Sequence, residues 1–198
     1  MIKNIIFDLS EVIISGYYGV EKILGDLLDM DYNKVDNVLK GNSFLELMEG
    51  KVSEDEYIYG ILKNTKWDIK LEKFKEIIRK NHNIEVVGTM GVIKKLKGKY
   101  KLILLSDHVE EWVQDILSKN NELEIFDKMY FSYELKSLKT DANTFKKVVK
   151  ESNIKIEETI FIDDSKDNIK VSKMVGIDGI LFENSEQLEK ELIKRKLL

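Results

Sequence analysis

The sequence predicts an α/β protein: a Rossmann-like parallel sheet of about five strands flanked by helices, with an α-helical cap inserted after the first strand. Short apolar runs of strand length recur along the chain, and segments with apolar residues three and four positions apart separate most of them. Between about residue 15 and residue 86, helical segments follow one another without a strand. Strands that alternate with helices form parallel sheets covered on both faces.

The expected strands are apolar runs rich in β-branched and aromatic residues. They cover residues 4–7, 101–106, 128–132, 159–163 and 179–182. Apolar residues at helical spacing separate or follow the later strands, at residues 109–119, 141–152, 165–176 and 185–196. This alternation is typical of a doubly wound sheet.

The inserted region contains further helical segments. They cover residues 19–30, 33–41, 42–50, 53–64 and 70–82. Ser53 followed by Glu56 is the signature of a capping box at a helix start. We therefore expect a Rossmann-like core domain of residues 1–14 and 87–198 and an α-helical cap domain of residues 15–86.

Composition excludes several classes of function. The 198 residues are 43% hydrophobic and 34% charged, with a formal net charge of -4 and lysines interspersed with acids, which argues against a nucleic-acid binder. No cysteine is present, so disulfides, thiolate metal sites and cysteine nucleophiles are excluded. The N-terminus shows no leader and no run is long enough to cross a bilayer, so we expect a cytoplasmic protein without a membrane partner. A monomer or homodimer is also expected.

Polar residues stand at the ends of the expected strands. Asp8, Ser106 and the pair Asp163 and Asp164 occupy such positions, and ligands of open parallel sheets bind at these strand ends. Two unit charges about 4 Å apart repel by about 4 kcal/mol at an effective dielectric of 20, so three converging carboxylates call for a cation. An all-oxygen site suits Mg²⁺, and Lys139 offers a positive charge for a phosphate.

Four motifs in order resemble the haloacid dehalogenase-like (HAD) superfamily of phosphohydrolases. They are FDLSEV with Asp8, LLSD with Ser106, LKSLKTDANTF with Lys139, and TIFIDDSKDNI with the acidic pair. The likeness covers most of the chain and extends to a cap after the first strand. GKVSEDEY and FIDDSKDNI are similar to the branch that includes α-glucose-1-phosphate phosphatase.

The resemblance implies a role for each matching residue. Asp8 is expected to attack phosphorus and form an aspartyl-phosphate. Mg²⁺ is expected to bind the Asp8 carboxylate, the main-chain carbonyl of Ser10 and Asp164, with Asp163 acting through a water. Ser106 and the backbone N–H of Asp107 are expected to bind the phosphoryl oxygens, and Lys139 to bridge the phosphate and Asp8.

Ser10 departs from the family pattern. Most phosphatases that the chain resembles place a second aspartate there, which protonates the leaving group and then activates water. Serine cannot do this unaided, and general acid–base help is worth about 10²- to 10⁴-fold. Glu11 is a possible replacement, although alternation along a strand favours a side chain that points away from the metal.

Neighbouring polar residues have structural explanations from the sequence alone. We expect His108 to be solvated near a helix start, and the carboxylate of Asp107 to turn outward as a helix cap. His82 is expected on the surface. Asp167 and Asn168 fit either an orienting role beside the metal ligands or helix capping.

The aromatic residues of the cap leave two interpretations open. Trp67, Tyr57, Tyr59 and Phe44 could line a substrate pocket, but aromatics at helical spacing more often pack in a core.

Three functions are compatible with these observations. The favoured one is a Mg²⁺-dependent phosphatase acting on a small phosphorylated metabolite, with a sugar phosphate preferred because of the resemblance. The second is a non-catalytic or weakly active phospho-ligand binding protein, which Ser10 favours. The third is a dehalogenase that uses Asp8 on carbon, which the acidic pair and Lys139 disfavour because metal-free carbon chemistry needs no cation site.

Overall fold

The computed structural model describes residues 1–198 and contains a five-stranded sheet whose strands all pair in parallel, in the order β3-β2-β1-β4-β5. The strands are β1 (Asn4–Phe7), β2 (Lys101–Ser106), β3 (Lys128–Phe131), β4 (Thr159–Asp163) and β5 (Asp178–Leu181). The predicted α/β class and all the predicted strands are confirmed, with ends shifted by one residue at most.

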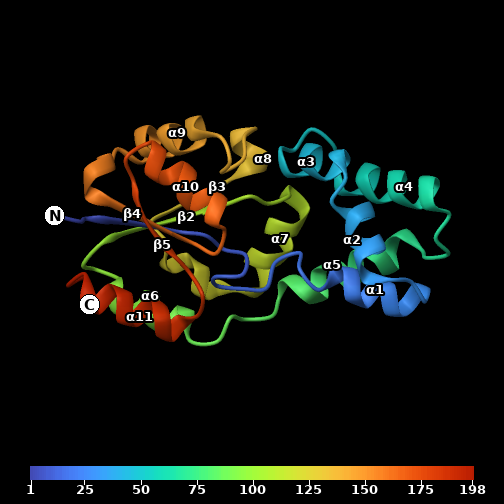
Figure 1. Ribbon diagram of the computed structural model, residues 1–198, viewed down its shortest axis with the longest axis horizontal. Helices are drawn as coiled ribbons and strands as arrows, with labels where there is room; N and C mark the ends of the chain where they lie inside the picture. The colour runs from blue at the N-terminus through green and yellow to red at the C-terminus, as the bar shows by residue number, and fades with distance from the viewer.

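Each strand contributes to two apolar clusters, because successive side chains point to opposite faces of a sheet. Ile5 and Phe7 pack beneath the helices on one face, whereas Ile6 packs beneath those on the other. The first face is covered by α6 (Thr89–Leu96), α7 (Glu110–Lys119) and α11 (Ser185–Lys194), and the second by α9 (Ala142–Ser152) and α10 (Lys166–Met174). Figure 1 shows α9 and α10 on the side of the sheet opposite α6 and α11.

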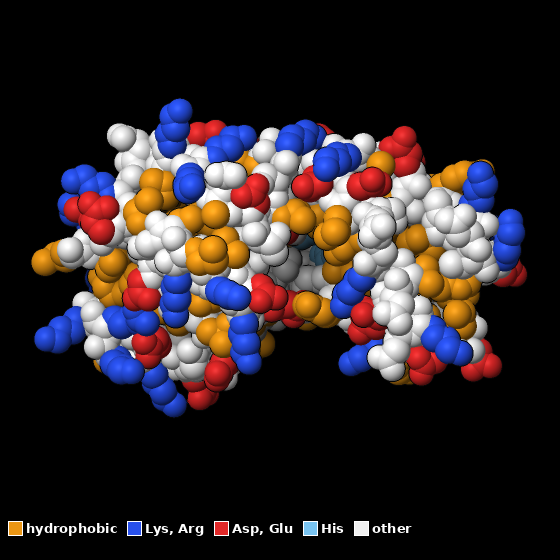
Figure 2. Space-filling model, turned by 45° about the horizontal axis from the view of Figure 1, so that its top comes forward, with side chains coloured by type: hydrophobic (Ala, Val, Ile, Leu, Met, Phe, Trp, Pro, Cys, Tyr) orange, Lys and Arg blue, Asp and Glu red, His pale blue; other side chains and the backbone are white.

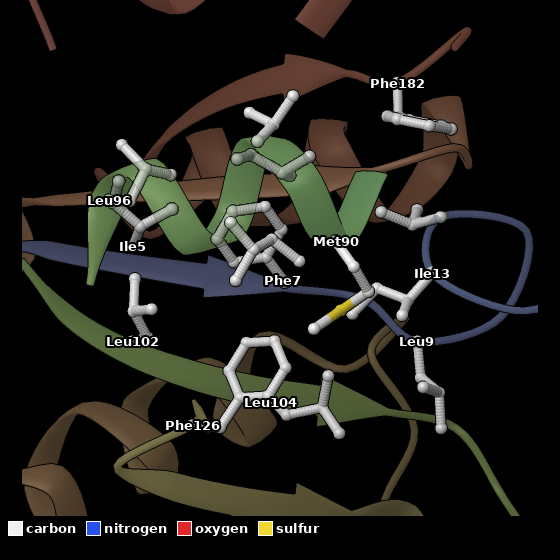
Figure 3. Packing of buried hydrophobic residues seen from close by; sticks show 14 of the residues in the cluster. Ile5, Phe7, Leu9, Ile13, Met90, Leu96, Leu102, Leu104, Phe126 and Phe182 are labelled. Atoms are coloured by element: carbon white, nitrogen blue, oxygen red, sulfur yellow. The ribbon is translucent and has the colours of Figure 1, made fainter. Parts of the chain in front are cut away.

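The first cluster contains two aromatic rings that meet beside the central strand β1. Phe7 meets Phe126 edge to face, with ring centroids 6.0 Å apart and an interplanar angle of 65°. Figure 3 shows both rings beside Met90 and Leu104. The burial of β1 on both faces fixes the position of the residues that follow it.

Several short elements were not predicted. Helix α6 begins after Gly88, whose φ of 89° favours glycine, and it buries Met90, Ile93 and Leu96 at three-residue spacing. That spacing was the signal in the sequence. The remaining elements are α8 (Ser132–Leu135) and the 3₁₀ turns η1 (Asn121–Ile125) and η2 (Ile156–Glu158).

The helical segment between β1 and β2 packs around its own apolar cluster, which includes Leu24, Tyr57 and Phe74. Its helices are α1 (Val20–Leu28), α2 (Tyr32–Leu39), α3 (Asn42–Met48), α4 (Glu54–Thr65) and α5 (Leu71–His82), as predicted. Both bonds of the predicted capping box are present at the start of α4. Figure 1 shows these helices grouped at one end of the molecule, and we refer to them as the helical part.

Two connections join the helical part to the sheet and pair with each other. The N–H of Ser15 donates to the carbonyl of Ile84 at 2.7 Å, and the N–H of Val86 donates to the carbonyl of Ile13 at 2.9 Å. Both expected domain boundaries lie in this paired connection; the division into two domains stays a prediction. None of the helices combines the length and the apolar character that crossing a lipid bilayer requires.

Candidate active site

The carboxyl edge of the sheet brings the motif residues together. Chain order reverses beside β1, because β2 and β3 lie on one side of it and β4 and β5 on the other. Asp8 directly follows β1, Ser106 ends β2 and Asp163 ends β4. In an open parallel sheet, the ends of the strands at such a reversal form the binding crevice.

Three carboxylates converge at this edge. One oxygen from each of Asp8, Asp163 and Asp164 lies within 4.8 Å of the others. Asp8 and Asp163 are buried, whereas Asp164 is partly exposed. Burial raises the pKa of Asp8 well above its usual value; Lys139 opposes the rise, and Asp163 and Asp164 add to it. Burial and Asp163 likewise raise the pKa of Asp164, so the cluster disfavours its own negative charge.

Lys139 balances part of this charge. Its Nζ lies 2.6 Å from Oδ2 of Asp8 and 2.8 Å from Oδ2 of Asp163, and the side chain is buried. Burial lowers the pKa of Lys139, but the charges of Asp163 and Asp8 outweigh burial and raise it overall. The ammonium therefore stays charged between the two carboxylates.

Asp107 holds Lys139 in place. Its Oδ1 accepts the backbone N–H of Lys139 at 3.0 Å, across 32 residues of sequence. The expectation that Asp107 turns outward and caps a helix is wrong, since α7 begins after Val109 without a side-chain cap. Burial raises the pKa of Asp107 while Lys139 lowers it.

The rest of the acidic motif orients Asp163. Its Oδ1 accepts the N–H of Ser165 at 2.8 Å and the amide of Asn168 at 3.1 Å. Asn168 thus orients Asp163, whereas Asp167 is exposed and Ser165 caps α10. An orienting role beside the carboxylates therefore holds for Asn168, which contacts Asp163. It does not hold for Asp167, which is exposed in the first turn of α10.

Ser106 is fully buried at the end of β2, and its Oγ has no hydrogen-bond partner in the protein. Leaving a buried hydroxyl unpaired costs about 1–3 kcal/mol, so such groups are uncommon away from functional sites. The hydroxyl lies at the edge where the sequence predicts phosphate binding, although Ser106 does not line the cavity described next.

A cavity of about 330 Å³ separates the carboxyl edge of the sheet from the helical part. Asp8, Lys139 and Asp164 line it on the sheet side, and Tyr17 and Phe44 line it on the helical side. Figure 2 shows a hollow between the two parts of the molecule, with histidine surface at its floor. The volume suits a small molecule.

Ser10 and Glu11 also line the cavity. Glu11 adopts a φ of 58°, and its Oε1 accepts the N–H of Gly16 at 2.7 Å. A Cβ at Gly16 would lie 2.8 Å from Cβ of Ser10, so only glycine fits there. Glu11 lies four residues after the end of β1 and has a left-handed backbone, so the alternation of the strand does not determine where its side chain points. Its role as the replacement acid stays a prediction. Burial raises the pKa of Glu11, the Gly16 N–H lowers it and Asp164 raises it again.

Both histidines are buried, against the expectation of a solvated His108 and a surface His82. Their exposures are 2% and 1%, and both line the cavity. His82 is the last residue of α5, and His108 lies two residues after the end of β2. The sequence places them 26 positions apart, so only the packing of the helical part on the sheet brings them together.

The aromatic residues of the helical part divide between core and cavity. Tyr57 is 2% exposed in the core of the helical part, while Phe44 lines the cavity. Tyr59 is 65% exposed, and Trp67 packs partly buried against the helical cluster. Trp112 of α7 was missed by the sequence analysis; it lines the cavity and stacks on Tyr17, with centroids 5.2 Å apart.

The donor set fits a hard divalent cation. Its charged groups are carboxylates, and carboxylate oxygens are the ligands that Mg²⁺ and Ca²⁺ prefer. Oxygens bound to one octahedral Mg²⁺ lie at most about 4.2 Å apart for bonds of about 2.1 Å, close to the spacing found here. Asp164 is the accessible carboxylate, because Asp163 is already bonded to Lys139 and Asn168.

Comparison with known proteins gives a consistent result. A family model described as haloacid dehalogenase-like hydrolase matches residues 5–182. The D-ribitol-5-phosphate phosphatase of Bacteroides thetaiotaomicron is 30% identical over 201 aligned positions, covering 97% of each chain.

Two solved structures share the fold. One is a HAD family enzyme of Bacteroides thetaiotaomicron in complex with magnesium and inorganic phosphate, with a TM-score of 0.76, 24% identity, and coverage of 93% of this chain and 96% of that one. The other is a predicted HAD-like family hydrolase of Porphyromonas gingivalis, with a TM-score of 0.83, 23% identity, and coverage of 99% and 98%.

Proposed function

Because the chain belongs to the haloacid dehalogenase-like hydrolase family, we propose that it is a Mg²⁺-dependent phosphatase of a small phosphorylated metabolite, with a sugar or polyol phosphate as the substrate. One observation carries the proposal. Asp8, Lys139 and Asp164 line one cavity at the carboxyl edge of the sheet, with Lys139 Nζ 2.6 Å from Asp8. The relationship to a D-ribitol-5-phosphate phosphatase supports the substrate class.

Asp8 is the proposed nucleophile. Its Oδ1 accepts the N–H of Leu9 at 2.7 Å and its Oδ2 bonds to Lys139, which fixes the orientation of the carboxylate. A carboxylate oxygen attacks phosphorus, the bond to the ester oxygen breaks, and the leaving alkoxide takes a proton from a general acid, for which Glu11 is the candidate. Water then attacks the aspartyl-phosphate, which returns Asp8 and releases inorganic phosphate.

The residues around Asp8 stabilise the transferring group. Asp8, Asp164 and the carbonyl of Ser10 would hold Mg²⁺, and Asp163 would act through a water. When bound, Mg²⁺ neutralises charge on the phosphoryl oxygens. Ser106, with its unpaired hydroxyl, and the backbone N–H of Asp107 would bind those oxygens, and Lys139 would bridge the phosphate and Asp8.

The identity of Ser10 favours a second candidate, a phospho-ligand binding protein with little or no turnover. Serine keeps the carbonyl ligand and removes a negative charge beside an anionic ligand, so binding survives without a general acid. Glu11 lines the same cavity, and a proton supplied by its carboxyl group would favour the phosphatase.

Release of inorganic phosphate from a panel of sugar, polyol, alkyl and aryl phosphates, with and without Mg²⁺, separates these candidates. We expect Mg²⁺-dependent release by the wild type and none by Asp8→Asn, because an amide is a poor nucleophile of nearly the same volume. Asp167→Asn, which changes an exposed aspartate of α10, is the control and should behave as the wild type. Full activity of Asp8→Asn would refute the nucleophile, and tight binding without release would favour the binding protein.

A further inference from the structure

The two histidines meet at the cavity, one from each part of the molecule. The rings of His82 and His108 have centroids 5.3 Å apart at an interplanar angle of 81°. Both side chains are more than nine-tenths buried and both line the cavity that contains Asp8. The proposed chemistry at phosphorus uses neither ring.

Three of their four nitrogen atoms lack a hydrogen-bond partner. They are Nδ1 and Nε2 of His82 and Nε2 of His108. Nδ1 of His108 accepts the N–H of Val109 at 3.2 Å, so the proton of a neutral ring lies on Nε2, which becomes a free donor. His82 adds one free donor and one free acceptor. Burying such groups unpaired costs about 1–3 kcal/mol each, so a partner is expected.

The surroundings keep both rings neutral. Burial lowers the pKa of His108 to about 3, and Lys139 adds to this effect. Burial, followed by His108 and Arg79, lowers the pKa of His82 well below its usual value. Neutral imidazoles form no ion pair with a carboxylate or a second phosphate, but they donate to and accept from hydroxyl groups.

The neighbouring wall is aromatic. The ring of Trp112 lies 4.7 Å from that of His82 between centroids, and Tyr17 stacks on Trp112 with an interplanar angle of 10°. Flat apolar rings beside neutral hydrogen-bonding groups match a carbon chain that carries hydroxyl groups, with its C–H groups against the rings.

We propose that His82 and His108 form a subsite that hydrogen-bonds the hydroxyl groups of an uncharged polyol or sugar chain, and thereby select the ester whose phosphate lies at Asp8. This inference rests on the proposed function and names its substrate class. The free nitrogen atoms are shielded from solvent, so the proposal requires the helical part to shift on the paired connection before hydroxyl groups can reach them.

The test compares esters that differ only in hydroxyl groups. We measure kcat/KM on D-ribitol 5-phosphate, n-pentyl phosphate and p-nitrophenyl phosphate for the wild type, His82→Leu and His108→Leu. The wild type should prefer the ribitol ester over the pentyl ester by at least about 100-fold, because a site built for hydroxyl groups rejects analogues that lack them. Each substitution should lower kcat/KM for the ribitol ester by about 10- to 100-fold and leave the pentyl ester unchanged.

Thr89→Val provides a matched control. Thr89 is also fully buried with an unpaired hydroxyl, but it does not line the cavity, so its loss should leave the ratio between the two esters unchanged. His82→Asn and His108→Asn keep a polar group and replace the leucine variants if those do not fold. They should retain part of the preference for the ribitol ester over the pentyl ester.

Two outcomes would overturn the inference: a wild type that does not distinguish the two esters, or variants that lose both activities in proportion. Absence of any hydrolysis, including that of p-nitrophenyl phosphate, would refute the phosphatase instead. Affinities for the ribitol and pentyl esters, measured by calorimetry, then test the proposed subsite. A preference for the ribitol ester that the histidine variants lose supports it, and equal binding refutes it.

Discussion

Ser10 and Glu11 together occupy the place where a single acid–base group would be expected. Ser10 lies two residues after Asp8 and lines the cavity, while the carboxyl group of Glu11 is bonded to the N–H of Gly16. A general acid must come within hydrogen-bond distance of the leaving oxygen, and the bond to Gly16 restricts the movement of the Glu11 carboxyl group. If Glu11 is the general acid, turnover requires its carboxyl group to leave the N–H of Gly16 when a substrate binds.

We predict that Ser10→Asp raises the rate of phosphate release, by up to about 10²- to 10⁴-fold, because it supplies a positioned acid–base group. Ser10→Asn has nearly the same shape without the carboxylate and should give no gain. Steady-state release from one aryl and one sugar phosphate measures the effect. Equal rates for the two variants would show that the charge at this position is not what limits turnover.

A fast wild type gives a different expectation at Glu11. If it hydrolyses the sugar phosphate at the rate of an efficient phosphatase, Glu11→Gln should abolish that activity, since Glu11 is then the substitute acid. Retention of the rate in Glu11→Gln would exclude this role.

The buried histidines predict a loss of stability in acid. The pKa of His108 is about 3 in the folded protein and about 6.5 in the unfolded chain, so between these values only the unfolded chain binds the proton. Acidification from pH 7 to pH 5 should therefore lower the free energy of unfolding by about 2 kcal/mol through His108.

Urea denaturation of the wild type and His108→Leu at both pH values measures this effect. The variant should lose less stability on acidification, because it lacks the group whose unfolded form takes up the proton. Lys139 and His82, which adjoin His108, are unchanged in both proteins, so an identical pH dependence would refute the assignment.

Three helices meet at one buried carboxylate. Glu54 at the start of α4 is 1% exposed and pairs with Arg79 of α5 through two bonds, of 2.5 and 2.6 Å. It also accepts the indole N–H of Trp112 in α7 at 2.7 Å. This contact links the helical part to the sheet part.

The two partners of this ion pair should respond unequally to substitution. Arg79→Met leaves the charge of Glu54 buried and should cost about 3–5 kcal/mol of unfolding free energy. Glu54→Gln leaves Arg79, whose side chain is 25% exposed and therefore accessible to solvent, so the cost should be smaller. Chemical denaturation measures both, and a larger loss for Glu54→Gln would contradict this account of the site.

Mg²⁺ binding should be visible in the stability of the whole molecule. A ligand that binds only the folded state adds about 2.7 kcal/mol at one hundred times its Kd, which corresponds to a rise of about 5 to 10 °C in Tm for a chain of this size. Asp164→Asn should remove the rise, because Asp164 is the accessible carboxylate of the cluster.

Asp167→Asn serves as the control for this measurement. Asp167 is exposed in the first turn of α10 and contacts none of the three carboxylates, so the variant should keep the wild-type response to Mg²⁺. A wild-type Tm that does not change in millimolar Mg²⁺ would count against the site.

Much of the fold was predictable because its signals are local. The strands at 4–7 and 159–163 are apolar runs of the right length, and Ser53 with Glu56 marks a helix start over four residues. Helix α6 was not predicted although its buried residues Met90, Ile93 and Leu96 have helical spacing, because it is only eight residues long and contains Gly91.

The amino-acid sequence by itself determined the sheet, the inserted helices and the residues at the strand ends, because hydrophobic periodicity and motif order are local properties of the sequence. Only the tertiary structure decided where Glu11, Asp107, His82 and His108 point. Asp107 contacts Lys139, 32 residues away, and His82 contacts His108, 26 residues away. No local sequence pattern predicts contacts over such distances. Burial of a polar group depends on the element that packs over it, so the cavity and its neutral histidines exist only after the helical part meets the sheet.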